Sequence, residues 1–597
     1  MPGTLTELFQ RAAAEHAQCA ALQHKVDGEY RSITYAALAR RVMRFARGLA
    51  ALGVEAGDRV AIIAENRPEW AVADLATLAL GAINVPLFTS LSPAQIRYIL
   101  DHSGARLVIV SNASLLRTVL QATSDDVDVR VVVMDPPASL PDGAVAFDAV
   151  LELADGSPLT EESYHAAWVQ VVPDQLASIV YTSGTTGEPK GVMLTHANFV
   201  SNVRAAHEVL RFTRRDVLVS FLPLSHVLER MAAYYLALSW GACVAYSEGP
   251  RHLRDNILEV RPTMMLLVPR VYEVFQEGIE ARMAKLEGLP RRLYEWSFRV
   301  GRARATALNE GRIPSLGVAV QWAVAKLLFI RKLHAAMGLD RLRYFVCGGA
   351  ALPPETAWFM LSLGLNILEG YGLTESSPVI SVNRPKQFRI GTVGLPLKGV
   401  EVRISEAGEI LARGPNVMRG YYRRPEDTAE AIDADGWLHT GDMGSLDEHG
   451  FLRVTDRLKS LIVLANGKNV APQPIENALQ ASPYIAQAVV LGDGRPTVGA
   501  LIVPAFDSLR RWAEGCGLEI PDGNGALAAS PHVRKLLREE IDRLTKDLAD
   551  YERIRRFQVL DHELTPEAGE LTPTLKTRRG VVAEHYADEV RALYGDA

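Results

Sequence analysis

Short runs rich in valine and isoleucine alternate along this chain with longer stretches of helical pattern. The runs lie at residues 59–63, 106–110, 129–134, 178–181, 217–221, 264–268 and 343–346. Strands that alternate with helices form parallel sheets with helices on both faces. From residue 391 the candidate strands are shorter and richer in turns, as at 400–404 and 408–413, which predicts a small antiparallel β subdomain. The fold class is therefore α/β.

The length of 597 residues exceeds what one hydrophobic core usually supports. Residues 454–471 resemble a boundary, and two short αβ-like units and a charged helical stretch follow them. We predict a large N-terminal domain, 1–456, with a helical insertion at about 277–343. A small α+β C-terminal domain should occupy 457–597.

Composition excludes several classes of protein. The chain is 48% hydrophobic and 22% charged, which argues against disorder, and its net charge of −6 gives no reason to expect nucleic-acid binding. No apolar run reaches the ~20 residues that a membrane span needs, and the N-terminus lacks the pattern of a secretory signal. The four cysteines form no C-x-x-C pair, which fits a reducing compartment without a disulfide framework or zinc site: Cys19, Cys243, Cys347 and Cys516. We expect a cytoplasmic protein with at most peripheral membrane contact.

The segment 277–343 has an unusual charge. It holds 13 Lys and Arg against 6 Asp and Glu, and mixes them with Trp296, Phe298, Trp322 and the apolar run 327–330. One interpretation is a helical insertion whose basic residues are simply solvated. The other is a surface that approaches anionic lipid through apolar area and basic charge.

A Gly/Ser/Thr-rich loop at residues 181–191 has the composition of a phosphate-binding loop. It reads Tyr-Thr-Ser-Gly-Thr-Thr-Gly-Glu-Pro-Lys-Gly and follows an apolar run. Its glycines let the backbone approach an anion, and its amides and hydroxyls can donate hydrogen bonds. It is not a Walker A loop, because Pro189 stands in place of the second glycine and Gly191 in place of the Mg²⁺-binding hydroxyl.

Three further strings carry polar groups suited to a nucleotide. Residues 369–375, Glu-Gly-Tyr-Gly-Leu-Thr-Glu, offer an aromatic ring to a purine, a hydroxyl to a phosphate and a carboxylate to Mg²⁺. Residues 437–442, Trp-Leu-His-Thr-Gly-Asp, end in a carboxylate that can accept from both ribose hydroxyls. Residues 571–576, Leu-Thr-Pro-Thr-Leu-Lys, end in an ammonium group that can stabilise charge at an α-phosphate.

Together these strings, in this order, closely resemble the motifs of the adenylate-forming (ANL) superfamily, and the resemblance covers nearly the whole chain. It implies that a carboxylate attacks the α-phosphate of ATP, giving an acyl-adenylate and pyrophosphate, and that the acyl group then passes to a thiol. It also implies that the C-terminal domain is a mobile lid. The implied catalytic residues are Lys576, Lys190 and His226.

The resemblance also assigns binding roles. Glu375 and Thr182 would hold Mg²⁺, Lys459 would be the hinge between domains, and Gly467 would lie in the pantetheine channel. The residues assigned to ATP and coenzyme A are Thr182, Ser183, Gly184, Thr185, Thr186, Gly187, Lys190, Gly348, Gly349, Ala350, Glu369, Gly370, Tyr371, Gly372, Thr374, Asp442, Arg457, Lys459, Gly467 and Lys576.

The absence of an aspartate from the segment 221–229 limits the class of carboxylate substrate. Adenylation domains for amino acids place an aspartate there, whereas this chain has Phe-Leu-Pro-Leu-Ser-His-Val-Leu-Glu. That string, the Pro-Arg-Val-Tyr-Glu string at 269–273 and the insertion resemble AMP-binding long-chain fatty acyl-CoA synthetases. His226 would lie near the reacting carboxylate or be an ordinary structural histidine, and Trp240 and 264–267 would line an acyl tunnel or belong to the core. An acyl-carrier protein as acceptor in place of coenzyme A, or a non-catalytic lipid-associated scaffold, are the alternatives.

Overall fold

The computed structural model describes residues 3–123, 129–182, 188–457, 461–466, 468–518, 523–546, 548–565, 568–571 and 577–595. The chain forms two compact units. The first contains Met1–Arg403, Leu411–Thr440 and Asp447–Leu452, and the second contains Ile404–Ile410, Gly441–Leu446 and Arg453–Ala597.

An eight-stranded sheet in the first unit has the order β19-β9-β8-β4-β3-β5-β6-β7. Its strands from β8 to β7 are parallel, whereas β9 and β19 are antiparallel to their neighbours. Several of the apolar runs in the sequence become buried central strands, because helices cover both faces. The strands are β3 (Arg59–Ile63), β4 (Ile83–Leu87), β5 (Leu107–Asn112), β6 (Arg130–Asp135), β7 (Ala144–Ala146), β8 (Leu176–Thr182), β9 (Lys190–Thr195) and β19 (Gly420–Tyr421).

A nine-stranded sheet has the order β16-β15-β14-β13-β12-β10-β11-β1-β2. The strands from β14 to β1 are parallel, and antiparallel strands lie at both edges. Its strands are β1 (Ala20–Val26), β2 (Glu29–Thr34), β10 (Val217–Ser220), β11 (Cys243–Tyr246), β12 (Met264–Leu267), β13 (Tyr344–Cys347), β14 (Ile367–Gly372), β15 (Val379–Val382) and β16 (Leu395–Pro396).

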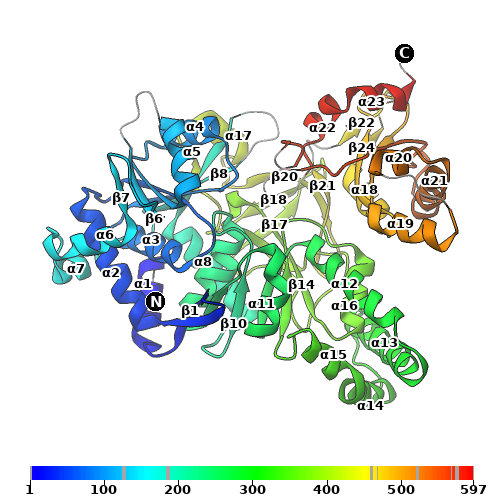
Figure 1. Cartoon of the computed structure of the whole chain (residues 1–597), viewed down its shortest axis with the longest axis horizontal. Helices are drawn as coiled ribbons and strands as arrows, with labels where there is room; N and C mark the ends of the chain where they lie inside the picture. Colours follow the sequence, from blue (N-terminus) through cyan, green and yellow to red (C-terminus); the bar gives the residue numbers. More distant parts are fainter. Residues whose placement is uncertain are drawn as a thin grey trace. The chain divides into compact units, whose positions relative to one another are not determined.

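Helices surround these sheets, as Figure 1 shows. Those before residue 261 are α1 (Leu5–Glu15), α2 (Tyr35–Ala51), α3 (Pro68–Ala79), α4 (Pro93–Ser103), α5 (Ala113–Thr123), α6 (Phe147–Glu152), η1 (Leu153–Gly156), α7 (Glu161–Gln170), α8 (His196–Leu210), α9 (Val227–Glu229), η2 (Arg230–Tyr235), α10 (Leu236–Ser239), η3 (Pro250–His252) and α11 (Leu253–Val260). One apolar core joins both sheets through α2, α3 and α8, with Phe45, Trp70 and Phe199 fully buried in it.

A buried ion pair crosses this core. The guanidinium of Arg230, in η2, donates to Asp74 Oδ1 in α3 at 2.5 Å and to Ser178 Oγ in β8 at 2.8 Å. Neither Arg230 nor Asp74 has any exposed side-chain surface. Asn84 of β4 and Tyr235 of η2 also donate to Asp74 Oδ1, so one carboxylate oxygen of α3 accepts from two other elements. Charges removed from water in this way are tolerated only when several hydrogen bonds satisfy them.

The predicted helical insertion at 277–343 is helical in the structure. Figure 1 shows α13, α14 and α15 together at one end of the first unit. The remaining helices of this unit are α12 (Pro269–Ala284), α13 (Gly288–Asn309), α14 (Leu316–Ala325), η4 (Lys326–Ile330), α15 (Arg331–Ala336), α16 (Pro354–Ser362), η5 (Thr374–Ser376) and α17 (Pro425–Ala431). Within the described ranges, no helix is both long enough and apolar enough to cross a bilayer.

Between residues 401 and 457 the chain forms a four-stranded sheet in the order β17-β18-β20-β21. Two tight turns, at Ser405–Glu409 and Asp447–Phe451, connect its strands as antiparallel hairpins. The strands are β17 (Glu401–Ile404), β18 (Glu409–Arg413), β20 (Leu438–Leu446) and β21 (Leu452–Arg457). The predicted α/β class with an antiparallel subdomain is therefore confirmed.

The second unit has its own core around a three-stranded sheet, β24-β25-β26. Strands β24 and β25 are antiparallel, and β26 is parallel to β25. Its elements are β22 (Ile462–Val463), β23 (Asn469–Val470), α18 (Pro472–Gln480), β24 (Ile485–Leu491), β25 (Gly499–Pro504), α19 (Phe506–Gly515), α20 (Asn524–Ala529), α21 (Pro531–Thr545), β26 (Arg556–Val559), α22 (Arg579–His585) and α23 (Ala587–Tyr594).

Candidate active site

The phosphate-loop motif connects two antiparallel strands. Thr182 ends β8 and Lys190 begins β9, and the two residues are paired across the hairpin. Residues 183–187, which hold the predicted Ser183, Gly184, Thr185, Thr186 and Gly187, lie outside the described part of the chain. The hairpin therefore brings both ends of the motif, a hydroxyl and an ammonium group, to the same point.

Lys190 has two partners from a distant part of the sequence. Its ammonium group forms an ion pair with Asp427 at the start of α17, and it lies 5.1 Å from the ring centroid of Tyr421. The pairing with Lys190 lowers the pKa of Asp427, so the carboxylate is ionised at neutral pH. Both side chains keep part of their surface exposed, 30% for Lys190 and 23% for Asp427. An anionic ligand can therefore still reach the lysine.

Tyr421 connects the two nucleotide motifs. Its strand β19 pairs with β9, with Tyr421 opposite Val192, and its hydroxyl donates to Glu375 Oε1 at 2.9 Å. Burial raises the pKa of Tyr421, so the phenol stays protonated and remains a donor. The backbone amide of Met418 also donates to the carbonyl of Glu375, at 2.8 Å. Glu375 thus contacts the hydroxyl of Tyr421, while Lys190 lies over the ring of the same side chain.

The oxygen ligands of the nucleotide motifs, Glu375 and Thr182, fit a magnesium ion that is bound mainly through the phosphates of ATP. Glu375 supplies a carboxylate and Thr182 a hydroxyl, which are the hard oxygen ligands that Mg²⁺ prefers. Among the described residues no group of three His, Cys, Asp or Glu side chains could hold a metal by itself. Mg²⁺ in nucleotide enzymes commonly takes one or two protein oxygens, with waters and phosphates completing the shell.

The predicted adenine segment lies at the ends of two neighbouring parallel strands. Cys347 of β13 pairs with Glu369 of β14, so Gly348, Gly349 and Ala350 follow one strand while 370–372 end the other. Gly349 has φ +88°, a conformation that favours glycine, and a Cβ at Gly348 would lie 3.0 Å from Leu228. Tyr371 is half-buried. The glycine backbone and the ring of Tyr371 therefore lie at the carboxyl ends of two adjacent strands.

Glu369 differs from the other members of this segment. It is buried, and desolvation raises its pKa to about 8. Thr374 and Glu375 follow on the short η5 turn, which is half-buried. Glu369 is therefore largely protonated at neutral pH.

His226 caps the helix that follows β10. Its Nδ1 accepts a hydrogen bond from the Leu228 amide at 3.2 Å, so in the neutral ring Nε2 carries the proton. Its ring lies 6.5 Å from that of Phe88. Since Leu228 is also the residue closest to Gly348, the His226 turn adjoins the Gly348 turn. The histidine has a capping role whether or not it contacts substrate.

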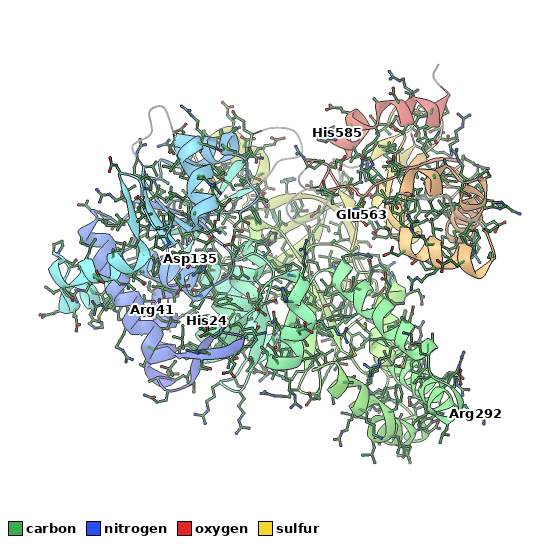
Figure 2. All side chains as sticks on the ribbon, in the orientation of Figure 1. His24, Arg41, Asp135, Arg292, Glu563 and His585 are labelled. Atoms are coloured by element: carbon green, nitrogen blue, oxygen red, sulfur yellow. The ribbon has the colours of Figure 1, made fainter. Side chains whose placement is uncertain are left out.

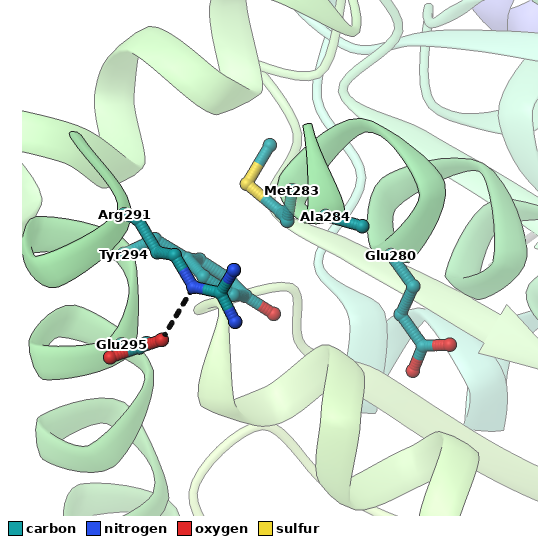
Figure 3. A pocket seen from close by; sticks show the side chains of 6 residues that line it. All are labelled: Glu280, Met283, Ala284, Arg291, Tyr294 and Glu295. Carbon is teal, nitrogen blue, oxygen red and sulfur yellow. Dashed lines mark hydrogen bonds and ion pairs between the residues drawn. The ribbon is translucent and has the colours of Figure 1, made fainter. Parts of the chain in front are cut away.

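The residues suggested for an acyl tunnel are packed in the core. All four residues of β12, Met264–Leu267, are buried, and the Trp240 ring stacks on His207 with centroids 3.5 Å apart. A small pocket of about 160 Å³ lies elsewhere, between α12 and α13. Figure 3 shows Glu280, Met283, Arg291 and Tyr294 around it, with Arg291 bonded to Glu295. None of the predicted site residues lines that pocket.

In the second unit, Asp442 on β20 is 4% exposed and Asp456 on β21 is 6% exposed. The amide of Gly441 donates to Glu409 Oε1 at 2.9 Å, and the amide of Gln473 to Asp456 Oδ2 at 3.3 Å. Arg457 ends β21. Lys459, Gly467 and Lys576 lie outside the described residues, so their predicted roles stay predictions.

Comparison with known proteins decides the family. Residues 9–422 match the family model of the AMP-binding enzymes, and residues 459–597 match that of the AMP-binding enzyme C-terminal domain. The chain belongs to the AMP-binding enzyme family. The resemblance inferred from the motifs is confirmed.

Curated relatives match this AMP-binding enzyme over 96% of its length or more. It is 36% identical over 590 residues to the long-chain-fatty-acid–CoA ligase FadD15 of Mycobacterium tuberculosis, covering 96% of this chain and 94% of the relative. It is 31% identical over 629 residues to the peroxisomal long chain acyl-CoA synthetase 7 of Arabidopsis thaliana, covering 100% of this chain and 87% of the relative.

Solved structures of similar fold include ATP-bound MatB from Rhodopseudomonas palustris, which is 25% identical with a TM-score of 0.71 and covers 98% of this chain and 99% of that one. The anthranilate CoA ligase AuaEII in complex with anthranoyl-AMP is 21% identical with a TM-score of 0.74, and 99% of each chain is covered. The second likeness concerns the fold alone.

Two residues of this site were missed by the sequence motifs. Tyr421 and Asp427 reach Lys190 from the segment after β18, and neither belongs to a string that suggested chemistry. The only local signal was the tyrosine pair, Tyr421 and Tyr422, after Gly420. A two-residue strand such as β19 is too short to be found from periodicity.

Proposed function

We propose that this AMP-binding enzyme activates a long-chain fatty acid with ATP and transfers the acyl group to coenzyme A. The observation that carries the proposal is the arrangement at Tyr421, which holds Lys190 and Glu375 at one place. The substrate class is supported by the sequence identity to ligases of long-chain fatty acids, which extends over nearly the full length of the chain.

In the first half-reaction a carboxylate oxygen of the fatty acid bonds to the α-phosphorus of ATP. The bond from that phosphorus to the bridging oxygen breaks, and pyrophosphate leaves with the electron pair. Lys190 would balance the charge of the departing pyrophosphate, exchanging its ion pair with Asp427 for one with the leaving group. Mg²⁺, held by Glu375 and Thr182, would supply further positive charge at the phosphates.

In the second half-reaction the thiol sulfur of coenzyme A bonds to the acyl carbonyl carbon. The bond from that carbon to the AMP oxygen breaks, AMP leaves with the electron pair, and the thiol proton is released to solvent. We assign residues 457–597 to a lid that turns about Lys459 between the two steps, so that Lys576 withdraws and the Gly467 loop admits the thiol. His226 would orient the reacting carboxylate, with Asp442 and Arg457 on the ribose and the 348–350 and 369–374 segments on the adenine and phosphates.

The proposal also covers the cellular location of the enzyme and the thiol that accepts the acyl group. We place the enzyme in the cytoplasm with peripheral contact to a membrane, because fatty acids partition into lipid and the insertion carries a basic surplus. Coenzyme A is the proposed acceptor, and an acyl-carrier protein presents the same phosphopantetheine arm.

The proposal is tested by ATP-dependent thioester formation with acids of two to twenty carbons, offered coenzyme A and a carrier protein in separate reactions. We expect the highest kcat/KM with long unbranched acids and coenzyme A. A maximum with acetate or an aromatic acid would overturn the substrate class. Thioester on the carrier protein alone would identify an acyl-AMP ligase, and no pyrophosphate release with any acid would favour a scaffold.

A further inference from the structure

The insertion carries an apolar stripe that faces away from the protein. Helices α14, η4 and α15 follow one another without a break from Leu316 to Ala336. Leu316, Val320, Val324 and Leu327 are 81%, 56%, 43% and 62% exposed. Residues spaced by three or four share one helix face, so these side chains form a continuous outward row.

Contacts on the opposite face of the continuous helix 316–336 hold it in this orientation. Trp322 fills the space beside Gly301 and Gly364, where a Cβ would lie about 3 Å from its ring. Phe329 contacts Tyr294 with ring centroids 5.7 Å apart, and Ile330 and Leu333 are buried. Rotation of the helix to hide the stripe would remove these contacts. The exposure is therefore built into the packing.

The exposed large apolar side chains of the described chain are concentrated in the insertion. Of the fifteen large apolar side chains exposed in the described part of the chain, seven lie between residues 289 and 328. They include Ile313, which is 93% exposed between α13 and α14, and Leu328. A gathered apolar patch of this kind marks an interaction surface, whereas isolated exposed residues do not.

The same helices carry a strong basic surplus. Residues 288–336 hold nine Lys and Arg against two Asp and Glu. Lys326, Arg331 and Lys332 are exposed and form no ion pair with any residue that the structure describes. Figure 2 shows Arg292, on α13, at the outer end of this region. Positive charge therefore lies beside the apolar stripe.

We propose that the face formed by Ile313, Leu316, Val320, Val324 and Leu327, with Lys326, Arg331 and Lys332 beside it, docks on an anionic lipid surface. A helix with an apolar face and basic flanks lies in the plane of the interface, with its apolar side chains among the acyl chains and its cations at the headgroups. Pairing with a second copy about a two-fold axis would bring the same basic residues together, which disfavours that occupant.

The inference rests on the proposed function in one respect: docking on a membrane would place the enzyme where its fatty-acid substrate is dissolved. Docking itself needs neither ATP nor fatty acid. It is measured as flotation of the full-length protein with vesicles, so its outcome is independent of whether the protein makes a thioester.

The experiment compares vesicles of phosphatidylcholine with vesicles that also contain phosphatidylglycerol, at low and at high salt. We expect the wild type to float with the anionic vesicles at low salt and to be released by salt. Leu316→Asp/Val320→Asp/Leu327→Asp and, separately, Lys326→Glu/Arg331→Glu/Lys332→Glu should each lower binding by about tenfold or more.

Matched controls change the same chemistry elsewhere on the first unit. Val169→Asp/Val172→Asp alters exposed apolar residues near the end of α7, and Arg117→Glu/Arg214→Glu/Arg215→Glu alters exposed cations. These variants should bind within about twofold of wild type if the α14 face alone docks. Far-ultraviolet circular dichroism checks that each variant is folded.

The proposal is overturned if wild type binds neither kind of vesicle, or if the controls lose as much binding as the α14 variants. It is also overturned if light scattering finds a dimer that only Leu316→Asp/Val320→Asp/Leu327→Asp dissociates while no vesicle binds. If the aspartate variant is unfolded, the glutamate variant decides, because its three positions are solvent-exposed and make no ion pair within the described chain.

Discussion

Lys190 and Asp427 form an ion pair beside the ring of Tyr421, although 237 positions separate them in the sequence. We propose that pyrophosphate binds the Lys190 ammonium group, which here pairs with the Asp427 carboxylate, so the two anions should compete for it. We expect Asp427→Asn to strengthen inhibition by pyrophosphate, while Lys190→Ala lowers kcat/KM for ATP by on the order of a hundredfold. Pyrophosphate inhibition measured at several ATP concentrations tests this. Weaker pyrophosphate binding in Asp427→Asn would mean that the carboxylate positions the lysine instead.

Gly372 and Gly370 provide a matched pair in the predicted adenine segment. A Cβ at Gly372 would lie 1.7 Å from the carbonyl oxygen of Pro378, whereas one at Gly370 would be no closer than 3.4 Å to its neighbours. Gly372→Ala should therefore displace the end of β14 and raise the KM for ATP. Gly370→Ala should leave it near the wild-type value. Equal effects of the two alanines would contradict a steric cause.

The buried pair of Arg230 and Asp74 should be costly to break. Arg230→Met or Asp74→Leu alone leaves an uncompensated buried charge and should lower the free energy of unfolding by about 3–5 kcal/mol. The double substitution should cost less than the sum of the two. Urea unfolding followed by tryptophan fluorescence measures this, with Lys398→Met, which removes an exposed pair with Glu208, as a control that should change little. Additive losses would argue against direct coupling.

Glu229 should make stability depend on pH. It is 1% exposed, and burial raises its pKa from 4.5 to about 8. The folded state then binds more protons than the unfolded state between these two values, so the free energy of unfolding falls as pH rises through that window. Glu229→Gln should reduce this slope and be more stable than wild type near pH 8. An unchanged slope would place the titration elsewhere, for example at Glu369.

Lys576→Ala separates the two half-reactions of the proposed mechanism. Removal of the ammonium group should abolish adenylation, since a lost transition-state charge costs ~3 kcal/mol or more. Thioester formation from a supplied acyl-adenylate should be spared, because the proposed lid movement withdraws the lysine in that step. Single-turnover pyrophosphate release and thioester yield distinguish the two. Adenylation within about tenfold of wild type would exclude a catalytic role for Lys576.

The buried strands could be predicted from sequence because each is a short apolar run between helical patterns. Residues 59–63 and 264–268 correspond to β3 and β12, and the run at 178–181 lies in β8, which ends at Thr182. Parallel strands deliver their carboxyl ends to the same side of a sheet, and in the structure the pairing of Cys347 with Glu369 brings Gly348 beside Gly370.

The contacts of the site could not be read in the same way. Tyr421 reaches Lys190 and Glu375 through a two-residue strand, and Asp427 reaches Lys190 from a seven-residue helix. Elements this short have no periodicity of their own and are formed by pairing with distant segments. The ion pair between Arg230 and Asp74 is equally non-local, and its members lie on two different helices.

By itself the sequence determined the alternation of strands and helices, the order of the nucleotide motifs and the basic surplus of the insertion, because propensity, periodicity and charge are local properties. Only the tertiary structure decided which side of each element is covered. The run Leu-Gly-Val-Ala-Val-Gln-Trp-Ala-Val-Ala in α14 is apolar enough to be a buried helix, yet of its ten residues only Ala325 is buried. Contacts of Trp322 with Gly301 and Gly364 fix the helix by its other face, and burial depends on such distant partners rather than on composition.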